Sequence, residues 1–338
     1  MSIALDIGTS RLRSLRREGV ELIGRSTPAT FSLIADDPSS RGLLTRAELA
    51  FATGEGELAL VGDAALEHAA AFRATPLPLL PGGMVPSDDP PARQLLGTII
   101  ESLLPEAEDV GSPCGLILPV ASMTDEASAE FIARLVRMRG YEPLPLTETH
   151  ALALATLSAE RFSGISIVMG AGGCSMSLIH RGRELAGVQE PRGTAWIDAL
   201  IASAGRRYAH GADGERYLDT ESVRRQRESL ADPLTRPTTD FASRVAEHYR
   251  ELLHTTAREF AASLRRDRLG RFETPLSVVC AGGGTRPAGF AALLTAALVA
   301  AELPFVLGPT KLAPCDEYVV ARGALIHAEL NAVSLAAA

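Results

Sequence analysis

Three glycine-rich stretches, each placed after a short apolar run, are the parts of the sequence best suited to chemistry. They are LDIGTS at 5–10, GAGGC at 170–174 and AGGGTRP at 281–287. A glycine turn that follows a strand exposes successive backbone N–H groups, which can bind anionic oxygens such as those of a phosphate. Each stretch alone could equally be an ordinary turn or hairpin. The three together favour a phosphate site built from distant segments.

Two carboxylates lie where they could serve such a site. Asp6 closes the first apolar run and is followed by the hydroxyls of Thr9 and Ser10, a setting suited to phosphate oxygens and a hydrated Mg²⁺. An Asx-type turn is the alternative. Glu148 stands where a predicted strand runs into an Ala/Leu-rich helix, and a carboxylate at such a junction can point into a cleft or simply interact with the helix dipole.

Two further motifs bear on which kind of nucleotide site the chain could contain. Glu221, Arg224 and Arg225 are spaced as neighbours on a helix, which usually means an ion pair on a solvated face. The stretch 281–287 joins a strand to a helix, as nucleotide loops do, but it lacks the Gly-Lys-Ser/Thr ending of a P-loop. It also lacks G-x-G-x-x-G, so a Rossmann dinucleotide site is disfavoured.

The elements that must position these residues alternate between strand and helix. Apolar periodicity predicts strands and helices throughout the chain. The predicted strands are 2–6, 12–17, 31–34, 58–61, 116–118, 143–146, 165–168, 175–179, 277–281 and 305–307. The predicted helices are 63–72, 92–104, 125–138, a segment from 151, 193–204, 241–266, 289–301 and 316–330.

Composition sets the class. A chain of 338 residues, 46% hydrophobic but only 5% aromatic and with 30 glycines, suits two lobes of helices packed on sheets, an α/β protein. A formal net charge of −8 disfavours nucleic acid and anionic membranes as partners. No run of 18 apolar residues is present, so we expect no membrane insertion and a cytoplasmic location. The four cysteines have no metal-like spacing, and we expect no structural disulfide.

The ordered set of three loops resembles the actin-like ATPase superfamily. LDIGTS looks like its phosphate-1 loop, the second stretch like phosphate-2, and AGGGTRP like the adenosine loop, especially the form in DnaK-type chaperones. The tail CDEYVVARGALIHAEL is similar to the closing helix of these proteins. Chain length and the stretch GERYLDTESVRR look more like the bacterial actin MreB. The resemblance covers nearly the whole chain.

The resemblance implies a two-lobed α/β fold of duplicated ribonuclease-H-like domains, with a small inserted subdomain in each lobe. Lobe I would comprise 1–148 and 316–338, with an insertion at about 28–76. Lobe II would comprise 149–315, with an insertion at about 186–240. ATP or ADP would bind in the cleft between the lobes.

The resemblance also assigns roles to the candidate residues. Asp6, with Gly8, Thr9 and Ser10, would hold phosphate and a hydrated Mg²⁺, and Glu148 would orient the attacking water. Gly170, Gly172, Gly173 and Cys174 would form the second phosphate loop. Glu221, Arg224 and Arg225 would lie around adenine and ribose. Gly282, Gly283, Gly284 and Arg286 would line the other side of the base.

The sequence departs from the superfamily at its second phosphate loop. The acid that helps hold the metal's water shell is replaced by Met169, and a second common acidic or polar position is Met176. A thioether cannot replace an anionic oxygen beside Mg²⁺. If that carboxylate contributes about 3 kcal/mol to the transition state, its loss slows hydrolysis roughly a hundredfold. We therefore expect slow or absent Mg-dependent ATP hydrolysis, which Met169→Asp should accelerate.

Three functions fit these features. The first is an MreB-like protein whose nucleotide state governs self-assembly into filaments or oligomers. The second is a DnaK-like chaperone or regulatory module that binds a protein partner without a peptide-binding domain. The third is a small-molecule kinase of the same superfamily, for which no separate base for a substrate hydroxyl is identifiable in the sequence.

Overall fold

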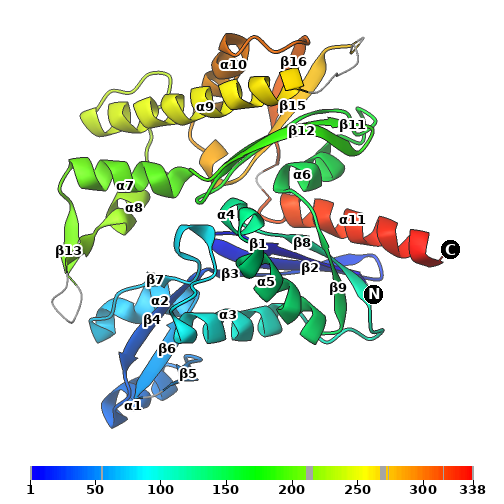
Figure 1. Ribbon diagram of the computed structural model, residues 1–338. Helices are drawn as coiled ribbons and strands as arrows, with labels where there is room; N and C mark the ends of the chain where they lie inside the picture. Colours follow the sequence, from blue (N-terminus) through cyan, green and yellow to red (C-terminus); the bar gives the residue numbers. More distant parts are fainter. Residues whose placement is uncertain are drawn as a thin grey trace.

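The computed structural model describes residues 2–54, 56–210, 216–266, 272, 274–314 and 316–336. These residues form two lobes, one around each of two main sheets (Figure 1). The mixed α/β, two-lobed architecture expected from the sequence is confirmed.

The main sheets of the two lobes repeat one plan within the described chain. The first has strand order β3-β2-β1-β8-β9 and the second β12-β11-β10-β15-β16. In each, an antiparallel meander of three strands is followed by two strands parallel to its first strand. The strands are β1 Ile3–Ile7, β2 Arg11–Glu18, β3 Glu21–Pro28, β8 Ser112–Ile117, β9 Tyr141–Pro145, β10 Gly164–Met169, β11 Cys174–His180, β12 Arg183–Glu190, β15 Leu276–Ala281 and β16 Leu307–Leu312.

Helices cover both faces of each sheet, and two of them are shared. One face of the first sheet packs on α3 (Pro90–Leu103) and α5 (Glu126–Met138). The corresponding face of the second packs on α9 (Asp240–Arg266) and α10 (Phe290–Ala300). Between the sheets lie α6 and α11, whose apolar residues join the inner faces of both (Figure 1). Their bounds are Glu148–Thr156 and Val319–Ala336.

The shared helices cross at very short range. A Cβ at Gly323 of α11 would lie 1.7 Å from the carbonyl oxygen of Ala151 in α6, so only glycine fits at this crossing. The start of α6 is fixed by Thr147, whose hydroxyl accepts the N–H of His150, as expected of an N-cap. This cap places Glu148 in the first turn of α6.

Smaller elements extend each lobe. In the first lobe a sheet of order β5-β6-β4-β7 and short helices occupy the region from 30 to 83. They are β4 Thr30–Ala35, α1 Pro38–Arg46, β5 Ala52–Thr53, β6 Glu57–Val61, α2 Asp63–His68, η1 Ala69–Phe72, β7 Leu77–Pro78 and η2 Pro81–Gly83. α4 (Val120–Thr124) follows β8.

The additional elements of the second lobe lie after its meander. They are α7 Thr194–Ala204, β13 Tyr208–His210, β14 Arg216–Leu218 and α8 Thr220–Glu228. β12 pairs within the main sheet as far as Glu190, so they begin later than residue 186. The subdomain and lobe boundaries stay predictions.

None of the described helices is both long enough and apolar enough to cross a lipid bilayer. Cys114, Cys174 and Cys280 are buried and free, and burial raises the pKa of each thiol to about 12. Cys315 lies outside the described residues.

Candidate functional site

The loop between β1 and β2 is a tight turn that requires glycine at position 8. The Gly8 N–H donates to the Arg11 carbonyl oxygen at 3.0 Å. A Cβ at position 8 would lie 2.7 Å from that oxygen, closer than real Cβ atoms approach one. Thr9 and Ser10 follow Gly8, and Ser10 is exposed. The two predicted hydroxyls therefore lie at the tip of the turn.

The loop between β10 and β11 meets this first loop across the lobes. A Cβ at Gly172 would lie 2.1 Å from the Thr9 hydroxyl oxygen, so the two loops touch. The Gly170 N–H donates to the Gly173 carbonyl at 2.9 Å, which closes the second loop. In the described chain, the N–H groups of Thr9, Ala171 and Gly172 donate to no protein acceptor. Unpaired N–H groups on adjoining loops can bind anionic oxygens.

The N-terminus of α7 fixes the second loop from behind. The Thr194 N–H donates to the Gly170 carbonyl and the Ala195 N–H to the Ala171 carbonyl, both at 3.0 Å. A Cβ at Gly193 would lie 2.5 Å from each of those oxygens. The carbonyls of the loop are thus occupied by α7, whereas N–H groups of the same loop stay available to a ligand.

The third glycine stretch packs on the end of β10. Gly282 has a φ of +100°, which favours glycine, and a Cβ there would lie 2.3 Å from the Met169 carbonyl oxygen. Gly284 is buried, and its Cβ would lie 2.6 Å from Met169 Cγ. Gly283 and Arg286 are exposed. The second and third loops are therefore in contact through Met169.

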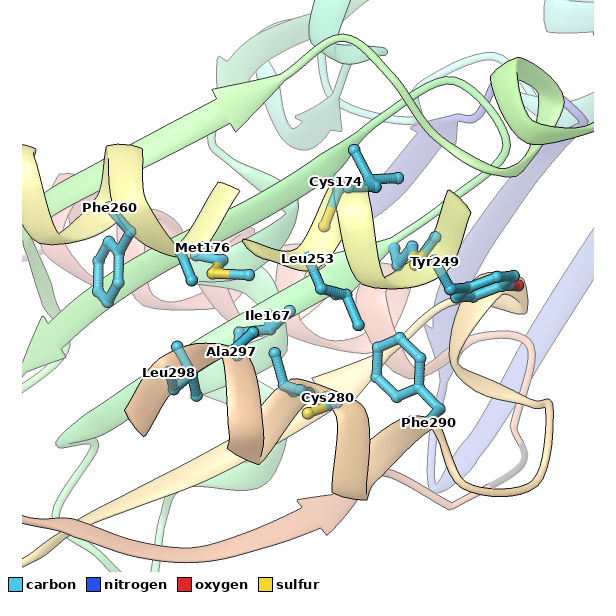
Figure 2. Packing of buried hydrophobic residues seen from close by; sticks show 14 of the residues in the cluster. Ile167, Cys174, Met176, Tyr249, Leu253, Phe260, Cys280, Phe290, Ala297 and Leu298 are labelled. Carbon is cyan, nitrogen blue, oxygen red and sulfur yellow. The ribbon is translucent and has the colours of Figure 1, made fainter. Parts of the chain in front are cut away.

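The two methionines and Cys174 face the core of the second lobe. Ile165, Ile167 and Met169 alternate along β10 and belong to one buried cluster beneath α9 and α10. Cys174 and Met176 enter the same cluster from β11, where Figure 2 shows them beside residues of α9. Only the backbone of Cys174 is therefore placed to bind a phosphate.

This packing changes the expectation for Met169→Asp. Met169 is completely buried, so the new carboxylate would be buried in an apolar cluster. Its neighbour Val168 lies on the other face of β10, opposite Ser175, which contacts Glu148. We therefore expect the substitution to destabilise the lobe rather than accelerate hydrolysis.

Glu148 lies in the first turn of α6, and none of the described residues forms an ion pair with it. The Ser175 hydroxyl donates to its Oε1 at 2.8 Å, which joins α6 to β11. Burial raises the pKa of Glu148 to about 8, and the negative charge of Asp6 adds to the shift. The carboxyl group is therefore mostly protonated at neutral pH, and Asp6 lies close enough to influence it.

Asp6 forms an ion pair that the sequence analysis missed. The Arg13 Nη1 donates to Asp6 Oδ2 at 3.2 Å. Burial raises the pKa of Asp6, while Arg13 opposes that rise. The signal was available, because the hairpin register sets Asp6 directly opposite Arg13. Counting back from the turn at Gly8 could have found it.

The residues around Asp6 fit a hydrated Mg²⁺ poorly. Its carboxylate already pairs with a guanidinium, and Met169, at the position of the expected second acid, faces the core. Mg²⁺ demands oxygen ligands in near-octahedral geometry. The described residues include no group of three or more His, Cys, Asp or Glu that could hold a metal ion.

The predicted ribose and adenine residues lie on α8 and pair with one another. Arg224 donates to Glu221 at 2.7 and 2.8 Å, and Arg225 donates to it at 2.9 Å. Glu228 lies 4.0 Å from Arg224. These residues thus form the ion-pair cluster on a helix that such a spacing usually indicates. Their predicted contact with a base stays a prediction.

A second aspartate–arginine pair was also not predicted from the sequence. Arg227 of α8 donates to both carboxylate oxygens of Asp198 on α7, at 2.7 and 2.9 Å. The residues are 29 positions apart, and no local pattern relates them.

Two surface hollows on the described chain lie away from the three loops. One, of about 810 Å³, lies beside α5 and is lined by Glu130, Arg134 and Pro143 among others. Another lies between α9 and α10, near Arg258. Because Thr9 already touches Gly172, a phosphate between the loops requires the lobes to move apart.

Two similar sheets, joined by shared helices and bringing their glycine loops together, form a fold that is shared with solved structures of MamK and MreB5. A solved structure of the MamK double helical filament is similar over 97% of this chain and 99% of its own, at 17% identity and a TM-score of 0.64. MreB5 of Spiroplasma citri bound to ADP is similar over 99% and 98%, at 15% identity and a TM-score of 0.57. At these identities the likeness is one of fold.

A family model described as Volactin matches residues 1–328. The chain belongs to the Volactin family. No curated protein sequence matches it.

Proposed function

We propose that this chain binds ATP or ADP between its lobes, with the phosphates at the junction of Thr9 and Gly172. The observation that supports this most is the meeting of two glycine loops from opposite lobes, with unpaired N–H groups on both. MreB5 of Spiroplasma citri, which shares the fold, has been solved bound to ADP and to AMPPNP. Glu221, Arg224 and Arg225 on one side, and Gly282–Gly284 with Arg286 on the other, would enclose the base.

We further propose that the nucleotide controls self-assembly into filaments or oligomers in the cytoplasm. The basis is the fold shared with MamK, which forms a double helical filament. The movement of the lobes needed to admit a phosphate would alter any surface formed by both lobes. The net charge of −8 gives no reason to expect a nucleic-acid partner.

Hydrolysis, if it occurs, would be slow. A Glu148 that is mostly protonated at neutral pH is a weak base for the attacking water. A Mg²⁺ beside Asp6 was predicted from the resemblance, and the ion pair with Arg13 is the main obstacle to it. No contact in the described chain favours the chaperone or kinase alternatives, and neither is proposed.

Two glycines of one loop test the phosphate site. Gly172→Ala places a methyl group against Thr9, whereas Gly170→Ala meets its nearest atom only at 3.9 Å. We expect Gly172→Ala to weaken ATP binding by at least about tenfold, a loss of about 1.4 kcal/mol, and Gly170→Ala to change it little. Isothermal titration calorimetry measures both. Equal affinities for the two variants would place the phosphates elsewhere.

Sedimentation and electron microscopy, with and without ATP, test assembly. We expect filaments or large oligomers that depend on nucleotide and are lost in Gly172→Ala. A protein that binds ATP yet stays monomeric at all concentrations would contradict the assembly proposal and leave the nucleotide site intact.

A further inference from the structure

The ion pair between Asp6 and Arg13 faces the layer between the two sheets. Ala4 and Leu15, two residues from Asp6 and Arg13 along their strands, pack with α6 and α11. Side chains two residues apart in a strand share a face. The guanidinium of Arg13 is therefore on the side of the sheet where the lobes meet.

The guanidinium also lies next to the first glycine turn. Its Nη1 is 3.8 Å from the position a Cβ would take at Gly8. Both side chains are largely shielded from water, with 10% of Asp6 and 20% of Arg13 exposed. A cation is thus fixed beside the turn that was predicted to hold phosphate oxygens.

The donors of Arg13 are mostly unused. Within the described chain, its one hydrogen bond is the contact with Asp6 at 3.2 Å. Its Nε is buried and has no protein partner. A guanidinium offers five N–H donors in a planar fork that matches a phosphate or carboxylate. Spare donors in a shielded place can bind a second anion.

The same guanidinium opposes a divalent cation. Mg²⁺ close enough to interact with Asp6 would be near a second positive charge, and the second loop supplies Met169 in place of an acid. A polyphosphate in the same place would bring negative charge to Arg13. The charge balance at the turn therefore favours the phosphate and disfavours the metal.

We propose that Arg13 takes the place of the divalent cation, so that the site binds the polyphosphate of a nucleotide without Mg²⁺. This rests on the proposed nucleotide function and states which chemistry serves it. The guanidinium would share its donors between Asp6 and the phosphates, and the Thr9 and Gly172 N–H groups would complete the anion site.

Calorimetric titration with ATP in excess EDTA, and again in millimolar Mg²⁺, tests the proposal on the unmodified protein. We expect affinities within about twofold of each other, since Arg13 is present in both conditions. Binding that requires Mg²⁺ would overturn the inference and leave the proposed function standing. Binding in neither condition would overturn both.

Variants of Arg13 separate its charge from its shape. Arg13→Gln should weaken ATP binding in EDTA by about tenfold to a hundredfold, as for a lost charge-assisted contact. Mg²⁺ should then recover part of the affinity, because Asp6 is freed. Arg13→Lys should be intermediate. Arg17→Gln, on the same strand but paired with Glu329, is the control and should bind as the unmodified protein does. Circular dichroism confirms folding.

Equal ATP affinity of Arg13→Gln and Arg17→Gln in EDTA, with both folded, would contradict the role of Arg13.

Discussion

Each lobe contains a shielded aspartate–arginine pair, and the two pairs differ in almost every other respect. In the second lobe Arg227 binds both oxygens of Asp198, and the side chains are only 4% and 3% exposed. In the first lobe Arg13 reaches one oxygen of Asp6 through one 3.2 Å bond and leaves its Nε without a partner. The Asp198–Arg227 pair thus uses both carboxylate oxygens, whereas the Asp6–Arg13 pair uses only one.

The difference teaches how to tell a structural pair from one available to a ligand. Burial raises the pKa of Asp198, and two short bonds from Arg227 oppose the rise. The pair joins α7 to α8 and leaves little of either charged group for another partner. The Asp6 pair adjoins the loop that meets the other lobe, and most of its donors are unused.

Breaking the Asp198–Arg227 pair should have the largest effect on the free energy of unfolding. Arg227→Ala leaves the Asp198 carboxylate buried without its cation, and we expect a loss of about 3–5 kcal/mol in the free energy of unfolding. Urea unfolding measures it. Arg225→Ala, on the same helix and with a side chain 67% exposed, is the matched control and should cost under about 1 kcal/mol.

A similar cost for both variants would mean that Asp198 finds another partner or water.

Much of the strand structure around Asp6, Arg13 and Met169 could be predicted from the sequence. The apolar runs and glycine turns predicted the first two strands of each meander, but not β3 or β12. The hairpin register implied by the turn at Gly8 sets Asp6 opposite Arg13. The core position of Met169 also follows from its alternation with Ile165 and Ile167. A period of two was sufficient for both features, although neither was predicted.

The pair in the second lobe could not be found in this way. Asp198 and Arg227 meet because α7 and α8 pack with a particular rotation about their axes, which depends on the tertiary packing of both helices. The contact of Thr9 with Gly172 likewise depends on how the lobes sit on α6 and α11. Local periodicity contains no information on either arrangement.

Glu148 has no arginine partner among the described residues, and its effect on the free energy of unfolding should be intermediate between those of the two pairs. Glu148 has a pKa of about 8, above its usual 4.5, so the folded state binds its proton more tightly than the unfolded state does. Its contribution to stability is therefore present at low pH and lost as pH rises from about 4.5 to 8. Because the side chain is only partly buried, we expect a loss of about 1–2 kcal/mol.

Thermal unfolding from pH 5 to 8 measures this loss in Glu148→Gln. The variant should keep the bond from Ser175 and lose less stability than the unmodified protein as pH rises. Glu130→Gln is the control, because the hydrogen bond from Arg134 lowers the pKa of that exposed acid. If Glu148→Gln and Glu130→Gln have the same pH profile, Glu148 is ionised throughout and could serve as a base.

The smallest expected effect on stability belongs to the Asp6–Arg13 pair, for which we propose a role in phosphate binding. Arg13→Gln removes a single long bond, and the remaining Asp6 can take up a proton in a site that already raises its pKa. We expect a loss of about 1 kcal/mol by urea unfolding, well below that of Arg227→Ala. A loss as large as that of Arg227→Ala would show that Asp6 and Arg13 serve mainly to hold the hairpin together. The contrast between the two lobes would then disappear, and the spare donors of Arg13 would need another explanation.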